Sequence, residues 1–255
     1  MTSVVVTGAS GRLGRAVTAR LAAEGFEVRA LSRTRRADGG GVRWAVADLT
    51  TGEGVGAALA GADAVVHLAS APYKGGYTRR VELDGTGTLL AAARAAGTGH
   101  LVYVSIVGVD RVPWGYYRIK LAAERLVRDG GVPWTTLRAT QFHEFAAEIF
   151  AGTARLGAVV ADPELPVQPV DVRDVAGHLA WLIERGPSGE VEEYGGPEVL
   201  TMAQAARQWL LSRRSRRRLL RVRVPGRLGR AFRAGHLTTS ARPAGKITWE
   251  EYLAG

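Results

Sequence analysis

Tyr116 and Lys120 are side chains able to exchange protons, and four positions separate them in the sequence. That spacing places both on one face of a helix. An ammonium group near a phenol favours the tyrosinate, so Tyr116 could pass a proton to or from a substrate oxygen. Tyr117 is a rival, but it is only three residues from Lys120. The pair predicts acid–base chemistry; the alternative is a packing tyrosine and a solvated lysine.

Three glycines, Gly8, Gly11 and Gly14, lie between a strand-like run and an amphipathic helix. In this context Gly8 permits a tight turn, Gly11 lets the backbone approach a pyrophosphate, and Gly14 allows close helix packing. The N-terminus of the helix supplies amide donors and positive potential. The sequence TGASGRLG therefore predicts a dinucleotide-binding loop, whose other expected cofactor-binding members are Ser10, Arg12 and Leu13.

The end of the second predicted strand bears on which dinucleotide is bound. An NAD site usually has Asp or Glu there, which binds the ribose hydroxyls. This strand instead ends Leu31-Ser32-Arg33. Arg33, supported by Arg12 and by Arg35 or Arg36, could neutralise a 2′-phosphate by bidentate contact. The pattern favours NADP(H); the alternative interpretation is a solvated arginine-rich turn.

The first half of the chain alternates short β-rich runs with helical patterns. Apolar runs such as residues 4–6 and 64–66 lack polar alternation, which is typical of strands covered on both faces. The order predicts an α/β protein with a Rossmann-type, doubly wound sheet of six parallel strands joined by helical crossovers. We expect strands at 3–7, 27–32, 42–48, 64–69, 100–105 and 134–138, and helices at 13–24, 55–60, 81–96 and 117–128.

After about residue 139 the pattern weakens into segments that contain proline and glycine, which predicts a small C-terminal substrate-side cap. We expect strands near Ala158 and Pro169 and helices at 172–184 and 202–212. Internal repeats and a linker are absent from the sequence. Residues 1–139 are therefore predicted to form the dinucleotide-binding core and residues 140–255 the cap, interleaved as one structural domain.

With these motifs the chain resembles the short-chain dehydrogenase/reductase superfamily, in its extended and atypical NmrA-like branch. Four further segments carry the likeness over most of the chain: Asp48-Leu49, His67 to Ser70, Gly85-Thr86 followed by Leu89 to Ala93, and Pro169 to Ala176. The resemblance implies an adenine contact at Asp48 and Leu49, and a cofactor-lining segment that contains Leu68, Ala69 and Ser70. It also implies that Tyr116 is the catalytic acid–base and that Lys120 holds the nicotinamide ribose.

Two positions depart from the family pattern. Glu82 stands where many extended members have the asparagine of a proton relay. The family's catalytic Ser or Thr lies just beyond the fifth strand, where Ser105 is the only hydroxyl candidate, one or two residues early. Ser105 either acts in catalysis or only ends the strand. Gln141 and His143 follow the sixth strand and are candidates to face the substrate, although a lone histidine is more often structural.

The net charge of +10 comes from one segment. Residues 213–233 hold ten arginines and no acidic residue, and 24 basic and 24 acidic residues remain elsewhere. The interspersed Leu219, Leu220, Val222 and Val224 predict a partly paired strand. No helix-turn-helix or stacking-aromatic module accompanies them, so nucleic acid is not the expected partner. A solvated face or a subunit contact is favoured, and a homo-oligomer stays open.

Composition excludes several other kinds of site. The chain has no cysteine, which removes disulfides, thiolate nucleophiles and cysteine-ligated metals. The five histidines lack metal-ligand spacing, so we expect no metal. No run of about eighteen apolar residues and no basic leader-like stretch occurs, so we expect a cytoplasmic protein without a membrane partner.

Together these patterns predict an enzyme, an NADP(H)-dependent oxidoreductase. It would transfer a hydride between the nicotinamide and a carbonyl, an alcohol or a conjugated double bond of a small organic substrate. Two alternatives stay open: an epimerase or dehydratase of the sugar-modifying type that retains its NADP, and a non-catalytic NmrA-like NADP(H) sensor. The departures from the family pattern at Glu82 and Ser105 keep the sensor as an alternative. The sequence does not identify the substrate.

Overall fold

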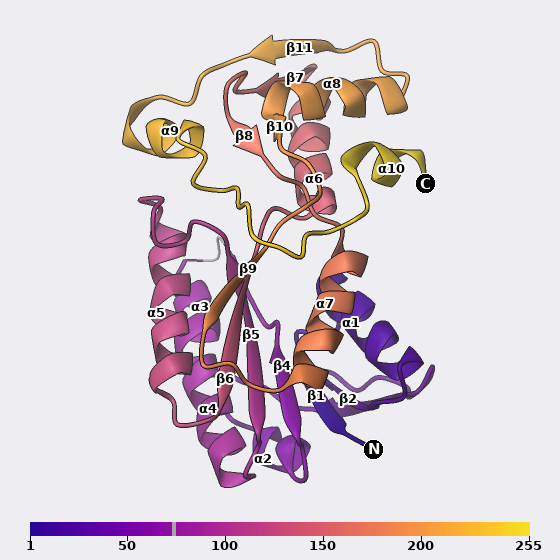
Figure 1. Cartoon of the computed structure of the whole chain (residues 1–255), viewed down its shortest axis with the longest axis vertical. Coiled ribbons are helices and arrows are strands. Elements are labelled where there is room, and N and C mark those ends of the chain that lie inside the picture. Colours follow the sequence, from indigo (N-terminus) through magenta and orange to yellow (C-terminus); the bar gives the residue numbers. More distant parts are fainter. Residues whose placement is uncertain (73–74) are drawn as a thin grey trace. The chain divides into compact units, whose positions relative to one another are not determined.

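The computed structural model describes residues 1–72 and 75–255 (Figure 1). By its internal contacts the chain divides into two units. Unit 1 consists of Met1–Ser105, Arg118–Leu137 and Val175–Glu192, and unit 2 of Ile106–Tyr117, Arg138–Asp174 and Glu193–Gly255. The chain passes repeatedly from one unit to the other. The functional boundary expected at residue 139 stays a prediction.

A seven-stranded sheet has the order β3-β2-β1-β4-β5-β6-β9. Its strands are β1 (Ser3–Thr7), β2 (Glu27–Ser32), β3 (Val42–Val46), β4 (Ala64–His67), β5 (His100–Ile106), β6 (Trp134–Ala139) and β9 (Val191–Tyr194). β1 pairs in parallel with β2 and with β4, and the backbone bonds from β5 to β6 and from β6 to β9 follow the same direction. The predicted α/β class and the Rossmann-type sheet are confirmed.

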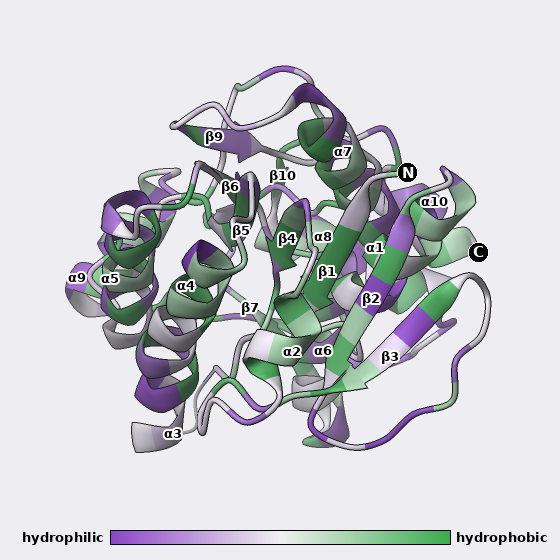
Figure 2. Cartoon of the chain, turned by 90° about the horizontal axis from the view of Figure 1, so that it is seen from below, coloured by the Kyte–Doolittle hydropathy of each residue, from purple (hydrophilic) through white to green (hydrophobic). Residues whose placement is uncertain are grey.

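The sequence predicts six strands, and that number is wrong because the edge strand β9 was missed. Its residues read Val-Glu-Glu-Tyr, so it has no apolar run of the kind that identified the inner strands. Figure 2 shows β9 as hydrophilic, whereas β1 and β4 are hydrophobic. An edge strand can carry charged side chains because only one of its sides is paired.

The inner strands and their helices form the core of unit 1. All five residues of β1 are buried, and Val5, Val65 and Leu101 belong to one apolar cluster. Figure 1 shows helices on both faces of the sheet. These are α1 (Arg12–Ala23) and α7 (Val172–Arg185) on one face, and α4 (Gly85–Ala95) and α5 (Gly115–Asp129) on the other; α2 is the short helix Val55–Leu59. This arrangement is a doubly wound fold.

Helix α1 follows directly from the pattern of its residues. Leu13, Val17 and Leu21 recur every four positions and are all buried, so one stripe of the helix packs on the sheet. The expected helix over residues 81–96 begins earlier in the structure and changes its type along its length. The α-helix α3 (Gly76–Arg79) continues into a π-helical turn, η1 (Arg80–Asp84), which continues into α4. In η1 the amide of Gly85 donates to the carbonyl of Arg80, five residues back.

Unit 2 is built around a second apolar cluster. Its elements are α6 (His143–Arg155), β7 (Ala158–Ala161), β8 (Pro166–Val167), β10 (Leu200–Thr201), α8 (Met202–Ser212), β11 (Arg218–Arg221), α9 (Gly226–Arg233) and α10 (Trp249–Ala254). β11 pairs in parallel with β7, which confirms the strand predicted within the arginine-rich segment. β8 pairs with β10 and begins three residues before the position expected for it. Trp249 is fully buried in the cluster, and its Nε1 donates to the carbonyl of Ala205.

Trp249→Ala is expected to destabilise unit 2 by about 3–5 kcal/mol, because it removes a fully buried aromatic side chain and leaves a cavity. Urea unfolding followed by circular dichroism measures the loss. Trp181→Ala is the matched control: Trp181 lies on α7 and is 44% exposed, so its removal should cost about 1 kcal/mol or less. Equal losses in the two variants would contradict the assignment of Trp249 to the core.

Candidate functional site

The turn between β1 and α1 has no room for a side chain at Gly8, and neither has the start of α1 at Gly14. Gly8 has a φ of +64°, and a Cβ on it would lie 2.6 Å from the carbonyl carbon of Leu68 and 2.7 Å from the nitrogen of Ala69. A Cβ on Gly14 would lie 2.2 Å from the carbonyl oxygen of Gly8. The amide of Gly11 donates to that same oxygen at 2.9 Å. The turn and the segment after β4 are thus in direct backbone contact.

Thr7, which the sequence analysis did not single out, ties the ends of β1 and β4 together. Its Oγ1 accepts hydrogen bonds from the amides of Leu68 and Ala69, each at 3.1 Å. The same oxygen lies 2.7 Å from Nδ1 of His67, whose Nε2 is 3.0 Å from Oγ1 of Thr86. Burial lowers the pKa of His67 to about 3, so the imidazole is neutral and works through these hydrogen bonds. Three of the predicted cofactor-binding residues, Gly8, Leu68 and Ala69, therefore lie together.

The N-terminus of α1 lies next to this turn. Helix α1 begins at Arg12 after Gly11, no side chain caps it, and its first turn contains no acidic residue. The backbone amides at its start and the helix dipole are therefore suited to an anion. Ser10 and Arg12 are exposed, whereas Leu13 is buried and anchors the helix.

Arg33 and Asp48 follow β2 and β3. Arg33 is exposed, and its Nη1 donates to the hydroxyl of Tyr77 at 2.6 Å. Two hydrogen bonds from Thr50 hold the pKa of Asp48 below its usual range, and the charge of Arg33 lowers it further. Leu49 is buried in the core of unit 1. Contacts of Arg33, Asp48 and Leu49 with a cofactor stay predictions.

Lys120 is buried, and its ammonium has several partners within unit 1. Nζ donates to the carbonyl of Val104 at 2.9 Å and lies 3.4 Å from Oε2 of Glu82. The other oxygen of Glu82, Oε1, accepts a hydrogen bond from the hydroxyl of Ser70 at 2.5 Å. The structure thus brings together two predicted site residues, Ser70 and Lys120, through a carboxylate. From sequence alone, Glu82 was noted only as a departure from the family's asparagine.

Tyr116 lies in the first turn of α5, on the same helix as Lys120. It is half-buried, and its ring centroid is 6.4 Å from that of Trp114 and 6.3 Å from that of Tyr117. Tyr117 is only 5% exposed and packs against Trp114, which suits a structural tyrosine. Tyr116 belongs to unit 2 and Lys120 to unit 1. Their joint action stays a prediction.

Ser105 lies within β5 instead of beyond it, and it is buried. Its hydroxyl has no hydrogen-bond partner among residues 1–72 and 75–255. A buried hydroxyl without a partner is uncommon and is compatible with a ligand contact as well as with a strand end. The structure therefore leaves the catalytic role of Ser105 a prediction.

Gln141 and His143, the candidate substrate residues, both make structural contacts in unit 2. Gln141 donates through Nε2 to the carbonyl of Leu237 at 2.9 Å, and its Oε1 accepts from the amide of Gln168 at 3.1 Å. His143 is fully buried against Trp249 and Tyr252, with Nδ1 at 3.5 Å from Asp171. Burial lowers the pKa of His143 although Asp171 opposes it. These contacts favour packing roles, and substrate contacts stay predictions.

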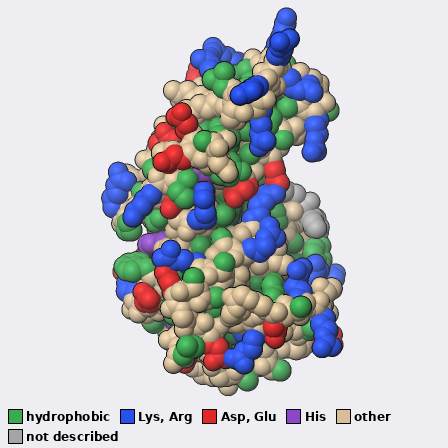
Figure 3. Space-filling view, turned by 90° about the vertical axis from the view of Figure 1, so that its right-hand side faces the viewer, with side chains coloured by type: hydrophobic (Ala, Val, Ile, Leu, Met, Phe, Trp, Pro, Cys, Tyr) green, Lys and Arg blue, Asp and Glu red, His purple; other side chains and the backbone are tan. Residues whose placement is uncertain are grey.

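The arginine-rich segment, residues 213–233, belongs to unit 2. Figure 3 shows basic side chains on the surface over α8 and β11. Two of its arginines are held by acids that follow β7: Arg233 bonds to Asp162 at 2.7 Å, and Arg223 pairs with Glu164. The segment is therefore partly anchored, and many of its remaining arginines are exposed.

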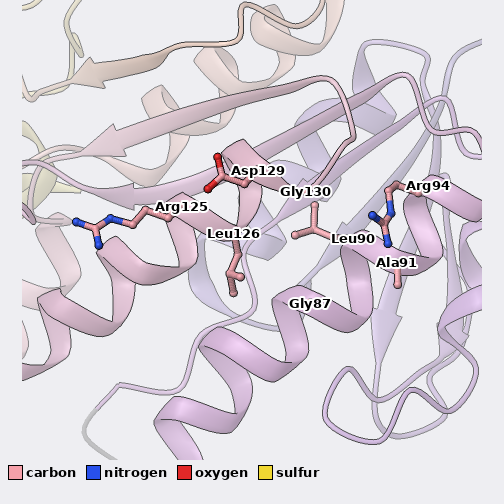
Figure 4. Close-up of a pocket in the computed structure, with 8 residues that line it drawn as sticks. All are labelled: Gly87, Leu90, Ala91, Arg94, Arg125, Leu126, Asp129 and Gly130. Atoms are coloured by element: carbon pink, nitrogen blue, oxygen red, sulfur yellow. The ribbon is translucent and has the colours of Figure 1, made fainter.

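A surface groove of about 270 Å³ lies between α4 and α5 of unit 1, as Figure 4 shows. It is lined by Gly87, Leu90, Ala91, Arg94, Arg125, Leu126, Asp129 and Gly130. None of the predicted site residues lines it. Over the described part of the chain, no helix has the length and apolarity needed to cross a membrane. Within that part, no group of three or more His, Asp or Glu is arranged to hold a metal ion.

Comparisons with known proteins give the following matches. A family model described as NAD(P)H-binding matches residues 8–184. The (4-alkanoyl-5-oxo-2,5-dihydrofuran-3-yl)methyl phosphate reductase of Streptomyces griseus is 34% identical over 212 residues, which are 80% of this chain and 72% of the relative. For three uncharacterised mycobacterial relatives, the match spans only 18% of their length.

Two solved structures share the fold over nearly the whole chain. A nucleoside-diphosphate-sugar epimerase from Staphylococcus aureus is 17% identical with a TM-score of 0.82, and the match covers 100% of both chains. The NADPH-dependent quinone oxidoreductase of Escherichia coli, solved with NADPH, is 20% identical with a TM-score of 0.80 over 98% of each chain.

Gly8→Ala is expected to weaken nucleotide binding at least tenfold and to lower stability, because its Cβ would collide with the backbone after β4. Titration of purified protein with NADPH, followed by nicotinamide fluorescence, measures the affinity. Gly25→Ala is the matched control: Gly25 also has a positive φ, +85°, but its Cβ would meet nothing within 4 Å. The control should lose about 1–2 kcal/mol of stability and keep its affinity. Equal affinities in both variants would contradict a nucleotide site at this turn.

Proposed function

Because the chain belongs to the NAD(P)H-binding family, we propose that it is an NADP(H)-dependent oxidoreductase acting on a small organic substrate. The observation that carries this proposal is the backbone cradle at Gly8 and Gly14, with the uncapped N-terminus of α1 beside it. A side chain is excluded at both glycines, and amide donors are present at the start of α1, which suits a pyrophosphate.

The residues present fit a dinucleotide along the carboxyl ends of the strands. Arg33, exposed at the end of β2, is suited to the 2′-phosphate that distinguishes NADP from NAD. The other residues that would hold the cofactor are Gly8, Ser10, Gly11, Arg12, Leu13, Gly14, Asp48, Leu49, Leu68, Ala69, Ser70 and Lys120. When bound, the nicotinamide supplies or accepts the hydride.

The chain's own contribution is the control of a proton. Tyr116 holds a proton on its hydroxyl and exchanges it with a substrate oxygen, and the ammonium of Lys120 on the same helix favours the phenolate. The substrate is a carbonyl, an alcohol or a conjugated double bond. The similarity to a reductase of Streptomyces griseus supports a reduction. Sugar epimerases share the fold as well, and a fold alone does not select between these reactions.

Arg33→Ala is expected to reduce NADPH affinity about ten- to a hundredfold and to leave NADH affinity unchanged, because only NADPH carries the 2′-phosphate. Fluorescence titrations with both nucleotides measure the change. Arg94→Ala, in the groove of Figure 4, removes an equal charge from unit 1 and should alter neither affinity. A wild-type protein that binds both nucleotides equally would contradict NADP specificity.

Tyr116→Phe is expected to lower kcat about a hundred- to ten-thousandfold while NADPH affinity stays within a factor of two or so, because it removes only the transferable proton. The assay follows NADPH oxidation with a panel of quinones, enones and ketones. Tyr117→Phe is the matched control and should keep most of its activity. Full activity of Tyr116→Phe would reject this residue as the acid, and tight NADPH binding without turnover on any substrate class would favour the sensor.

A further inference from the structure

Lys120 is an exceptional residue in this chain. Only three of the 34 basic residues are lysines, namely Lys74, Lys120 and Lys246. Lys120 is 4% exposed, which is rare for a lysine because its ammonium loses hydration on burial. The ammonium lies 4.2 Å from the centroid of the Tyr103 ring and donates to the carbonyl of Val104. Neither contact supplies a full negative charge.

Glu82 supplies that charge from a specialised piece of backbone. It is 0% exposed and lies in the middle of the π-helical turn η1, where the helix is locally widened. Such turns frequently occur at functional sites. Thr86 donates to the carbonyl of Glu82 at 2.6 Å, and Ser70 donates to its Oε1. The bond from Thr86 holds the backbone of Glu82, and the bond from Ser70 orients its carboxylate. The other carboxylate oxygen, Oε2, lies 3.4 Å from Nζ of Lys120.

We propose that Glu82 is the positioning residue for Lys120. The carboxylate of Glu82 fixes the buried ammonium of Lys120 and keeps it protonated. The neutral asparagine that the family resemblance leads us to expect at this position could accept a hydrogen bond but could not balance the charge. The link from this pair to proton transfer by Tyr116 rests on the proposed function. The ion pair between Glu82 and Lys120 does not depend on the proposed function.

The other groups that face Lys120 do not replace Glu82. His67 on β4 is neutral, since burial lowers its pKa to about 3. Tyr103 on β5 presents its ring. Glu124, one turn along α5, acts on Lys120 through its charge. Burial lowers the pKa of Lys120, and Glu82 opposes that effect more strongly than Glu124 does.

A lysine titration tests the proposal on the full chain. With three lysines, ¹³C labelling at the lysine side chains gives three resolvable signals, and Lys74→Arg and Lys246→Arg identify that of Lys120. In Glu82→Gln the acid dissociation constant of Lys120 is expected to rise at least tenfold, which is one pKa unit downward. Glu124→Gln is the matched control with a smaller rise, and Glu82→Asp should restore part of the wild-type value. An unchanged Lys120 titration in Glu82→Gln, or a larger effect of Glu124→Gln, would overturn the proposal.

A second measurement covers the case in which Glu82→Gln does not fold. Removal of both charges in Glu82→Gln/Lys120→Met should then give a protein more stable than Glu82→Gln alone, because an unpaired buried ammonium no longer remains. No recovery in the double variant would overturn the pairing.

Kinetics separates this inference from the proposed function. In an active enzyme, Glu82→Gln should move the pH dependence of kcat to lower pH in step with the Lys120 titration. A lower kcat with an unmoved pH profile would overturn the positioning role. A protein without any activity but with the expected Lys120 shift would refute the oxidoreductase and support the pairing.

Discussion

The approach of the β1–α1 turn to the backbone after β4 is the constraint on which the proposed nucleotide site depends. It requires Gly8, because any side chain there would occupy the space of Leu68 and Ala69. Thr7 reinforces the approach by accepting the amides of both residues. The sheet order sets the location: the chain leaves β1 towards β2 on one side and later returns to β4 on the other. A crevice at such a reversal, at the carboxyl ends of the strands, is where nucleotides bind in these sheets.

A second set of contacts connects the segment after β4 to α5. Ser70 follows β4 beside the glycine turn and donates to Glu82, and Glu82 contacts Lys120 on α5. A buried ammonium is tolerated only when its charge and its hydrogen-bonding groups are satisfied together. Here a carboxylate, a backbone carbonyl and an aromatic face do so. The position of the lysine ammonium is therefore set by three groups from two elements, η1 and β5.

Much of the fold followed from local patterns. The spacing of Leu13, Val17 and Leu21 predicts α1, and continuous apolar runs predict the inner strands, because each pattern reports a single element. The motif resemblance to an NAD(P)-binding superfamily is confirmed by the family match over residues 8–184. The edge strand β9 was missed because acidic residues interrupt its apolar pattern.

The candidate site was less predictable, because its decisive contacts join residues that are distant in sequence. No sequence pattern near Glu82 predicts that it is buried beside Lys120, although its place before the Gly85-Thr86 pair marked it as unusual. His143 carried the opposite signal: its position after β6 suggested a pocket, and the structure buries it against Trp249 and Tyr252. The types and order of the residues predicted a cofactor loop, whereas the burial of Glu82 and Lys120 and their pairing could be seen only in the folded chain.

Tyr116 and Lys120 are assigned to different units, but both lie on helix α5, so the acid–base hypothesis does not depend on how the chain is divided. The boundary between the units passes between Tyr117 and Arg118, inside a single helix of fifteen residues. The backbone hydrogen bonds of an α-helix fix positions one turn apart. The separation of Tyr116 and Lys120 along the helix is therefore a local property, independent of everything else in unit 2. Substrate identity is not local in this sense, because a substrate pocket combines side chains from separate segments of a fold. Sequence motifs alone therefore predicted a cofactor and a proton donor but no substrate.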